Sequence, residues 1–202
     1  MTKEMVRSLG IASEDVSHET SEKIKIYLQL LMHWNQSISL VSAQHEIWDR
    51  HVLDSVQLKN YINRSDLVAD LGSGNGFPGI ILAITTENKI DLYEVNQKKA
   101  SFLRYISSQL NLSLNIFSDF EKVEKKYDVM TIRAVDKLKN ILRKTSLLRT
   151  ENTRYLFLKG ESFQKELEEA LLDFNFSFTI YPSKSKKEGA VIEIWNVVEG
   201  NG

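Results

Sequence analysis

Apolar residues follow two different rhythms along this chain, and the rhythm changes near residue 66. In the first part, apolar positions recur at spacings of three and four residues, as they do on one face of an α-helix. These positions are Ile24, Tyr27, Leu28, Leu31 and Trp34. We expect Thr20 or Ser21 to cap this helix and a second helix to cover residues 46–62. The N-terminal part of the chain is therefore predicted to be helical.

From residue 66 onward, short apolar runs with strand composition alternate with stretches of helical character. The expected strands cover residues 67–71, 89–94, 114–117, 127–133 and 155–160. The expected helices between them cover residues 78–86, 96–110, 137–149 and 161–172. Such alternation is typical of βαβ units and a parallel sheet.

The C-terminal part breaks this alternation. Residues 174–181 and 190–198 are strand-like and are joined by a polar loop that contains no helical stretch. Two strands joined in this way can pair as antiparallel neighbours. The predicted fold is therefore α/β, with a doubly wound, Rossmann-like sheet that is mostly parallel and ends in an antiparallel hairpin. We expect residues 1–202 to form one domain, with residues 1–63 as a helical cap on a cofactor-binding core of residues 64–202.

The first expected strand runs into a glycine-rich turn with the sequence VADLGSGNGFPGI. Its glycines at positions 72, 74, 76 and 79 match both G-x-G-x-G and the dinucleotide pattern G-x-G-x-x-G. Glycines let the backbone bend sharply and approach a ligand without a Cβ atom in the way. Ligands of open α/β sheets lie beyond the carboxyl ends of the strands, where this turn is expected.

Glu94 ends the next expected strand, 20 residues after Gly74. A carboxylate at this position can accept hydrogen bonds from both ribose hydroxyls of an adenosine. The turn and the acid together indicate a nucleoside site. They do not distinguish NAD from S-adenosylmethionine.

Three features favour S-adenosylmethionine. Asp70 stands directly before the turn, where its charge would repel a pyrophosphate but attract a ligand that carries an ammonium and a sulfonium. Asp119 and Glu121 follow the third expected strand, where they could accept the amino protons of adenine. No downstream segment resembles a separate substrate domain for hydride transfer. An NAD-dependent oxidoreductase is the alternative that the residues leave open.

Composition and charge narrow the class of protein. The chain is 42% hydrophobic and 26% charged, which is ordinary for a soluble globular protein, and no apolar run approaches the ~18 residues of a membrane helix. We therefore expect a cytoplasmic protein. The absence of cysteine excludes disulfides, thiolate zinc sites and cysteine nucleophiles. A net charge of −1 argues against a protein that coats nucleic acid non-specifically.

Basic residues nevertheless gather in three clusters. The first contains Lys98, Lys99 and Arg104, the second is residues 137–149, and the third contains Lys184, Lys186 and Lys187. A run of charge is usually a solvated face of the protein, so these clusters alone do not establish a partner.

The missing residue types also bear on the acceptor of a methyl group. Methylation of pyrimidine C5 normally needs a cysteine, and this chain has none. Exocyclic amino groups are usually methylated by an Asn/Asp-Pro-Pro-aromatic loop, yet the two prolines, Pro78 and Pro182, are far apart. A ring nitrogen with an available lone pair needs neither device. The sequence is therefore compatible with attack by N7 of a purine.

Two further sets of polar residues have a structural and a functional interpretation. His51, Asp54 and Ser55 resemble a hydrolase triad, but triads normally unite distant segments, so we expect local pairings on the helix that also dock the cap. Arg133 and Lys159 end two expected strands at the ligand edge. Arg133 could hold a carboxylate, a phosphate or a guanine edge, or form a salt bridge, and Lys159 has the same ambiguity.

A series of motifs resembles the bacterial small-subunit ribosomal RNA guanine-N7 methyltransferases, also called glucose-inhibited division protein B. In chain order they are HWNQSISLVS (33–42), RHVLDS (50–55), DLGSGNGFPGI (70–80), KKASFLR (98–104), DVMTIRAV (128–135) and FLKG (157–160). The specific feature is RHVLDS together with a glycine loop that continues into Phe-Pro-Gly.

The resemblance implies a class I methyltransferase sheet under a helical cap, S-adenosylmethionine as the cofactor, and methylation at N7 of one guanosine in 16S rRNA of the small ribosomal subunit. It places cofactor contacts at Gly72, Phe77, Phe120, Glu121 and Arg133, to which the residue-based argument adds Gly74 and Glu94. We expect no metal, no catalytic side chain and a monomer, and the basic clusters gain rRNA phosphates as a partner.

This chain departs from the family pattern at two positions. Asp119 stands where the family usually has arginine, and Ser39 stands where asparagine is common. The first departure bears on the charge beside the adenine pocket and not on the reaction. A non-catalytic ribosome-binding module is a further alternative, but the intact glycine loop and its acid argue against it.

Overall fold

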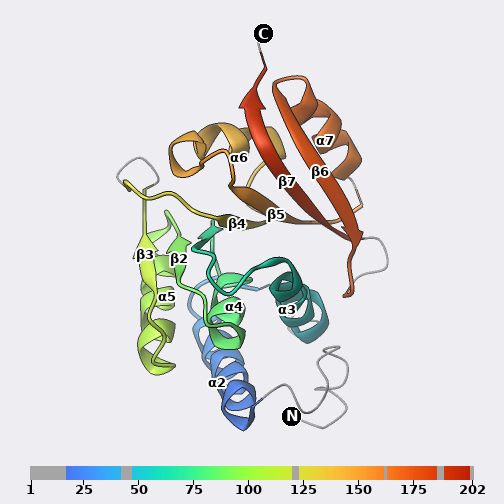
Figure 1. The fold of residues 1–202 in the computed structure, drawn as a ribbon. Coiled ribbons are helices and arrows are strands. Elements are labelled where there is room, and N and C mark those ends of the chain that lie inside the picture. Colours follow the sequence, from blue (N-terminus) through green and yellow to red (C-terminus); the bar gives the residue numbers. More distant parts are fainter. Residues whose placement is uncertain (1–16, 42–46, 120–122, 162, 186–188, 201–202) are drawn as a thin grey trace.

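A seven-stranded sheet lies at the centre of the computed structural model, which describes residues 17–41, 47–119, 123–161, 163–185 and 189–200 (Figure 1). The strands are β1 (Val68–Leu71), β2 (Ile90–Tyr93), β3 (Asn115–Phe117), β4 (Val129–Arg133), β5 (Arg154–Lys159), β6 (Phe174–Pro182) and β7 (Ala190–Glu199). Their order is β3-β2-β1-β4-β5-β7-β6, with β1 to β5 parallel and β7 antiparallel to both β5 and β6. The predicted doubly wound sheet with its C-terminal hairpin is confirmed.

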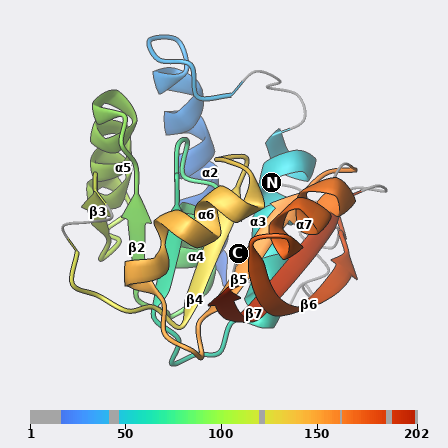
Figure 2. The ribbon, with the colours of Figure 1, turned by 90° about the horizontal axis from the view of Figure 1, so that it is seen from above.

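Helices cover both faces of this sheet. They are α2 (His18–Trp34), α3 (Asp54–Val56), α4 (Gly79–Thr85), α5 (Gln97–Gln109), α6 (Leu138–Lys144) and α7 (Phe163–Leu171). Helices α3, α4 and α5 lie on one face, with α2 outside α4, and α6 and α7 lie on the other (Figures 1 and 2). The chain therefore forms three layers with a core on each side of the sheet.

The two cores explain why the parallel strands read as continuous apolar runs. Val68 of β1 points into the core with α2 to α5, whereas its neighbour Ala69 points into the core with α6 and α7. All four residues of β1 are buried, as are all four of β2. A parallel strand covered on both faces has no solvent side, so hydrophobic alternation disappears from its sequence.

The structure corrects three boundaries of the predicted helices. Ser17, not Thr20 or Ser21, caps α2, because its hydroxyl accepts the backbone N–H of Thr20 at 3.1 Å. The segment predicted as a helix over 46–62 contains a π-helical turn (Trp48–Leu53) before α3 and a 3₁₀ turn (Gln57–Tyr61) after it. The helix predicted over 137–149 ends at Thr145, whose buried hydroxyl bonds the carbonyl of Ile141 and the hydroxyl of Tyr155.

The second helical segment docks onto the β6–β7 loop. Buried Asp54 accepts hydrogen bonds from Ser185 at 2.6 Å and Gln57 at 2.8 Å, while the Gln57 side chain accepts the backbone N–H of Lys184 at 2.9 Å. The expected local pairing is present as well, since the Ser55 hydroxyl donates to the carbonyl of His51 at 2.6 Å. Asp54 and Ser55 therefore stabilise the packing of this segment, and they do not form a catalytic triad with His51.

Replacing Asp54 by alanine is expected to lower the free energy of unfolding by about 2 kcal/mol, because the buried amide of Gln57 and the partly buried hydroxyl of Ser185 lose their acceptor at once. Glu151→Ala, at an exposed turn, is the control and should stay within about 0.5 kcal/mol of the unsubstituted protein. Urea unfolding measures both. Equal stabilities of the two variants would contradict the docking role of Asp54.

Candidate nucleoside site at the glycine loop

The glycine loop leaves β1 at the carboxyl edge of the sheet, where β2 lies on one side of β1 and β4 on the other. The chain order of the strands reverses between β1 and β4, and α/β sheets bind ligands at such a switch point. Gly72, Gly74 and Gly76 have φ values of +67°, +55° and +97°. Side chains rarely tolerate this left-handed region, so the loop conformation requires glycine.

The glycines serve two different purposes. A Cβ atom on Gly72 would lie 2.5 Å from the side chain of Val135, and one on Gly79 would lie 2.4 Å from Leu92, so both glycines permit close packing. A Cβ atom on Gly74 would meet nothing nearer than the carbonyl oxygen of Gly72, at 3.6 Å. The same Cβ atom would lie 3.9 Å from Oε2 of Glu94, so a larger side chain at position 74 would extend toward that carboxylate.

Glu94 fixes this loop from the end of β2. Its Oε2 accepts the backbone N–H of Gly74 at 2.8 Å, and its Oε1 accepts the backbone N–H of Asn96 at 2.7 Å. The side chain is largely buried, with 7% exposure. The structure thus brings together the glycine and the acid that the spacing of 20 residues had paired.

The N-terminal cap holds the loop from the other side. The Tyr27 hydroxyl of α2 donates to the carbonyl of Asn75 at 2.7 Å, and the Asn75 amide donates to the carbonyl of Leu40 at 3.1 Å. Asn35 in turn accepts the backbone N–H groups of Leu40 and Val41 at 2.8 and 2.9 Å. No pattern in the sequence predicted this role for Tyr27, Asn35 and Asn75.

Phe77 lies at the centre of a cluster of rings and charge. The ring of His51 stacks on it at 5.1 Å between centroids, Tyr27 meets it edge-on at 5.2 Å, and the guanidinium of Arg133 lies 5.8 Å from its centre. Arg133 also contacts Nδ1 of His51. Phe77 and Arg133, both predicted as site residues, therefore meet beside the loop.

Asp70 has a structural role that the sequence argument did not foresee. The carboxylate is 1% exposed and accepts the Thr131 hydroxyl at 2.9 Å and the backbone N–H of Gly79 at 3.3 Å. Burial raises its pKa to about 6, although these hydrogen bonds and the charge of Arg133 act in the opposite direction. The carboxylate braces β1 against β4 and α4, and does not open onto the ligand edge as expected.

The remaining predicted residues divide into two groups. Phe120 and Glu121 lie outside the described residues, so their contact with adenine stays a prediction. Lys159 donates to Glu166 at 2.7 Å, and Glu166 also accepts the backbone N–H of Leu138, which joins β5, α6 and α7. The salt-bridge interpretation of Lys159 is therefore confirmed.

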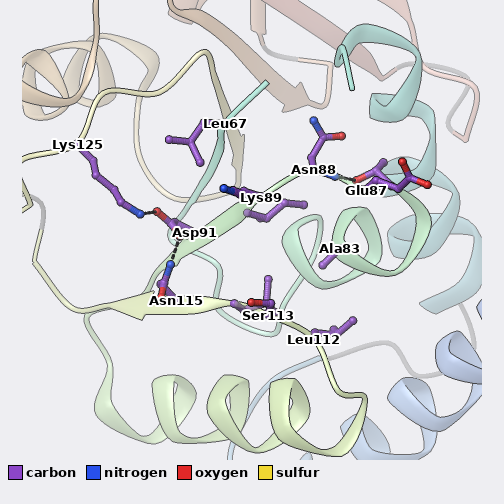
Figure 3. Close-up of a pocket in the computed structure, with 13 residues that line it drawn as sticks. Leu67, Ala83, Glu87, Asn88, Lys89, Asp91, Leu112, Ser113, Asn115 and Lys125 are labelled. Atoms are coloured by element: carbon purple, nitrogen blue, oxygen red, sulfur yellow. Dashed lines mark hydrogen bonds and ion pairs between the residues drawn. The ribbon is translucent and has the colours of Figure 1, made fainter. Parts of the chain in front are cut away.

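A cavity of about 330 Å³ lies at the opposite edge of the sheet, where β2 and β3 begin (Figure 3). Asp91 lines it and accepts hydrogen bonds from Lys125 at 2.6 Å and Asn115 at 2.7 Å (Figure 3). Asp91 also accepts the hydroxyl of Tyr127 at 2.8 Å. These neighbours already satisfy the carboxylate. The cavity lies where β2 and β3 begin, whereas the glycine loop lies at the carboxyl ends of the strands, so the cavity is not the ligand site of the loop.

Two negative findings hold for the part of the chain that the structure describes. No helix there is long and apolar enough to cross a membrane. No three histidine or acidic side chains there gather closely enough to hold a metal ion.

The class of protein follows from the fold and from solved structures that share it. The chain superposes with a TM-score of 0.60 on a variant of the protein MtNAS in complex with S-adenosylmethionine, at 16% identity, covering 87% of this chain and 75% of that one. It superposes with a TM-score of 0.59 on the ribosomal protein L11 methylase of Lactobacillus delbrueckii subsp. bulgaricus, at 12% identity, covering 77% and 80%. The fold is that of the class I methyltransferases.

The family follows from the sequence. Residues 20–189 match the GidB family model, rRNA small subunit methyltransferase G, and the chain belongs to this family. Relatives named ribosomal RNA small subunit methyltransferase G occur in Orientia tsutsugamushi (strain Boryong), at 40% identity over 89% of this chain and 92% of the relative, and in Gluconobacter oxydans, at 38% over 89% and 95%. In Rickettsia felis the values are 36% over 92% and 98%.

Replacing Gly74 by valine is expected to abolish binding of S-adenosylmethionine while the protein stays folded. The side chain enters the space in front of Glu94, and the left-handed backbone costs about 1–2 kcal/mol. Gly160→Ala is the matched control, because a Cβ atom there meets nothing within 4 Å. Calorimetric titration measures the affinity, and normal binding by Gly74→Val would show that the loop is misassigned.

Asp70 should make stability depend on pH in a defined direction. Its folded pKa of about 6 lies above the ordinary 3.8, so the folded protein holds the proton more tightly than the unfolded chain. The stabilisation is fully present below pH 3.8 and is lost as the pH rises through 6. Between pH 4 and 7 the wild type should lose up to about 3 kcal/mol relative to Asp70→Asn. Urea unfolding of both proteins measures this difference, and a difference that is constant with pH would refute the burial argument.

Proposed function

We propose that this protein transfers a methyl group from S-adenosylmethionine to N7 of a guanosine in 16S rRNA of the small ribosomal subunit. Membership of the rRNA small subunit methyltransferase G family supports the reaction. The observation that carries the site is the side-chain-free space over Gly74 beside the fixed carboxylate of Glu94. The dehydrogenase and the non-catalytic module considered from sequence have no comparable support.

The residues present fit an adenosyl ligand. Glu94 would accept the ribose hydroxyls, Gly74 would let the backbone approach the ligand, and Gly72 would contact the ligand through its backbone while its missing Cβ makes room for Val135. Val95 follows Glu94 directly and is 70% exposed, so it offers an apolar surface to the adenine ring. Phe120 and Glu121 would complete the adenine pocket.

Arg133 and Phe77 would hold the other end of the cofactor. The guanidinium suits the carboxylate of the methionine part, and its stacking over Phe77 together with the contact to His51 limits its freedom. A preoriented arginine loses less side-chain entropy when it binds a carboxylate. His51 is therefore a positioning residue in this proposal.

No catalytic side chain is assigned. The bound cofactor supplies a methyl group on a positively charged sulfur. N7 of guanine carries an available lone pair, so no proton has to be removed before attack. The chain has only to place the two reactants in line, and orientation alone can account for a large part of such a rate enhancement.

The cap and the core are proposed to act as one domain. Tyr27 reaches the glycine loop from α2, and Asp54 reaches the β6–β7 loop from α3.

We also propose that the protein is located in the cytoplasm, where it would meet its ribosomal RNA substrate.

The test is methyl transfer from labelled S-adenosylmethionine to small ribosomal subunits from cells that lack the enzyme. The expected product after nuclease digestion is labelled 7-methylguanosine at one site. Glu94→Gln has one acceptor oxygen in place of two, so it can keep the hydrogen bond from Gly74 or the one from Asn96 but not both. It should weaken cofactor binding about 10- to 100-fold, because a neutral amide is also a poorer acceptor for ribose hydroxyls. A wild type that binds the cofactor but labels no guanine would refute the proposed methyl acceptor. Normal cofactor binding by Glu94→Gln would refute the proposed role of Glu94.

A further inference from the structure

The basic clusters of this chain differ in what surrounds them. On and beside α6, Lys137 pairs with Glu169 at 2.9 Å and Lys144 with Asp136 at 2.7 Å. Lys139 and Arg143 share Asp173 at 3.6 and 3.1 Å. Arg143 and Lys144 also occupy the last turn of the helix, where positive charge is favourable. These ion pairs and the position at the helix end therefore explain why basic residues gather on α6 without an external partner.

The cluster on α5 has no such explanation. Lys98, Lys99 and Arg104 form no ion pair within the ranges that the structure describes, and no acid occurs between Val95 and Leu112. Lys98 and Lys99 lie in the first turn, where positive charge opposes the helix dipole. The positive charges of these two lysines therefore destabilise α5.

The α5 cluster is also held in a fixed position relative to the cofactor site. The carboxylate of Glu94 accepts the N–H of Asn96, and the Asn96 side chain accepts the N–H groups of Lys98 and Lys99 at 3.0 and 3.2 Å. Glu94 also holds Gly74. A short chain of hydrogen bonds therefore connects the glycine loop to the first turn of α5, which starts at the same carboxyl edge of the sheet (Figure 1).

The exposed face of α5 continues away from the site. Lys98, Ser101 and Arg104 are exposed at spacings of three residues, so each lies about 60° further around the helix than the last, and Arg104 lies ~9 Å beyond Lys98 at 1.5 Å per residue. Tyr105 is 37% exposed beside Arg104 and packs against Trp34 at 5.4 Å. Positive charge next to aromatic surface is the combination that binds nucleic acid.

We infer that the exposed side of α5 that carries Lys98 and Arg104, with the half-buried Lys99 at its margin, is the surface that binds the phosphates of the substrate RNA next to the methyl-transfer site. This inference rests on the proposed function. The ion-paired α6 cluster has no part in it. Of the third cluster, Lys186 and Lys187 lie outside the described residues.

The test compares two triple variants that remove the same charge. Lys98→Gln/Lys99→Gln/Arg104→Gln removes the α5 cluster, and Lys139→Gln/Arg143→Gln/Lys144→Gln removes three ion-paired cations. Binding of protein-free 16S rRNA is measured between about 50 and 200 mM salt, together with cofactor affinity, Tm and methyl transfer to subunits.

The α5 variant should bind RNA at least about tenfold more weakly. Its binding should also depend less on salt, with the magnitude of the negative slope of log K against log salt reduced by about 2, since each phosphate contact contributes about 0.7 to 1. Its cofactor affinity should be unchanged, and its Tm should be unchanged or higher because two cations leave the positive end of the helix dipole. The α6 variant should keep the RNA affinity and the slope but show a lower Tm.

Equal losses of RNA binding in both variants would mean that net charge alone matters, and would overturn the inference. So would an α5 variant that loses methyl transfer to subunits but binds protein-free rRNA normally, because the partner would then be a ribosomal protein. Failure of the proposed function can be distinguished from failure of this inference. If the wild type binds RNA through α5 but does not methylate it, the α5 variant would still bind RNA more weakly than the α6 variant, and only the methyl-transfer proposal would be wrong.

Discussion

The carboxylate of Glu94 is the contact on which the geometry of the site depends. It receives the N–H of Gly74 from the loop after β1 and the N–H of Asn96 before α5, and so joins two βα connections that meet only at the sheet edge. The hydrogen bonds are charge-assisted and largely shielded from water, which makes them stronger than bonds between neutral groups. Without this acid the glycine loop would keep the bond from the N–H of Ser73 to the carbonyl of Tyr93 at 2.9 Å, but Gly74 would lose its attachment to the end of β2.

The opposite side of the loop depends on the cap. Tyr27 holds the carbonyl of Asn75, and Asn35 closes the turn whose Leu40 carbonyl receives the Asn75 amide. A glycine loop is entropically costly to order, because glycine loses more conformational freedom than any other residue. Attachment from both β2 and α2 orders the loop before a ligand arrives, which reduces the entropy lost on binding.

The sequence predicted most of the fold because its signals are local. Apolar runs of strand length, helical spacing over α2 and α5, and glycines at the end of β1 each depend on a few neighbouring residues. The wrong helix boundaries have two kinds of cause. Thr145 ends α6 with a hydroxyl that meets Tyr155 on the neighbouring strand β5, which no local pattern announces, whereas Ser17 caps α2 through a local bond to Thr20 in a segment that offers several capping residues.

The different fates of Asp70 and Glu94 follow from register, which the sequence alone did not resolve. Asp70 lies opposite Leu92 inside the paired part of β1 and β2, and Leu71 opposite Tyr93 forms the last pair. Glu94 comes one residue after that pair, at the level of Gly72. An acid inside a sheet covered on both faces must be buried and satisfied by neighbours such as Thr131, whereas an acid just beyond the last pair can reach the loop. The distance of an acid from the last strand pair, and not its presence alone, therefore distinguishes the carboxylate that reaches the glycine loop from the one that is buried in the sheet.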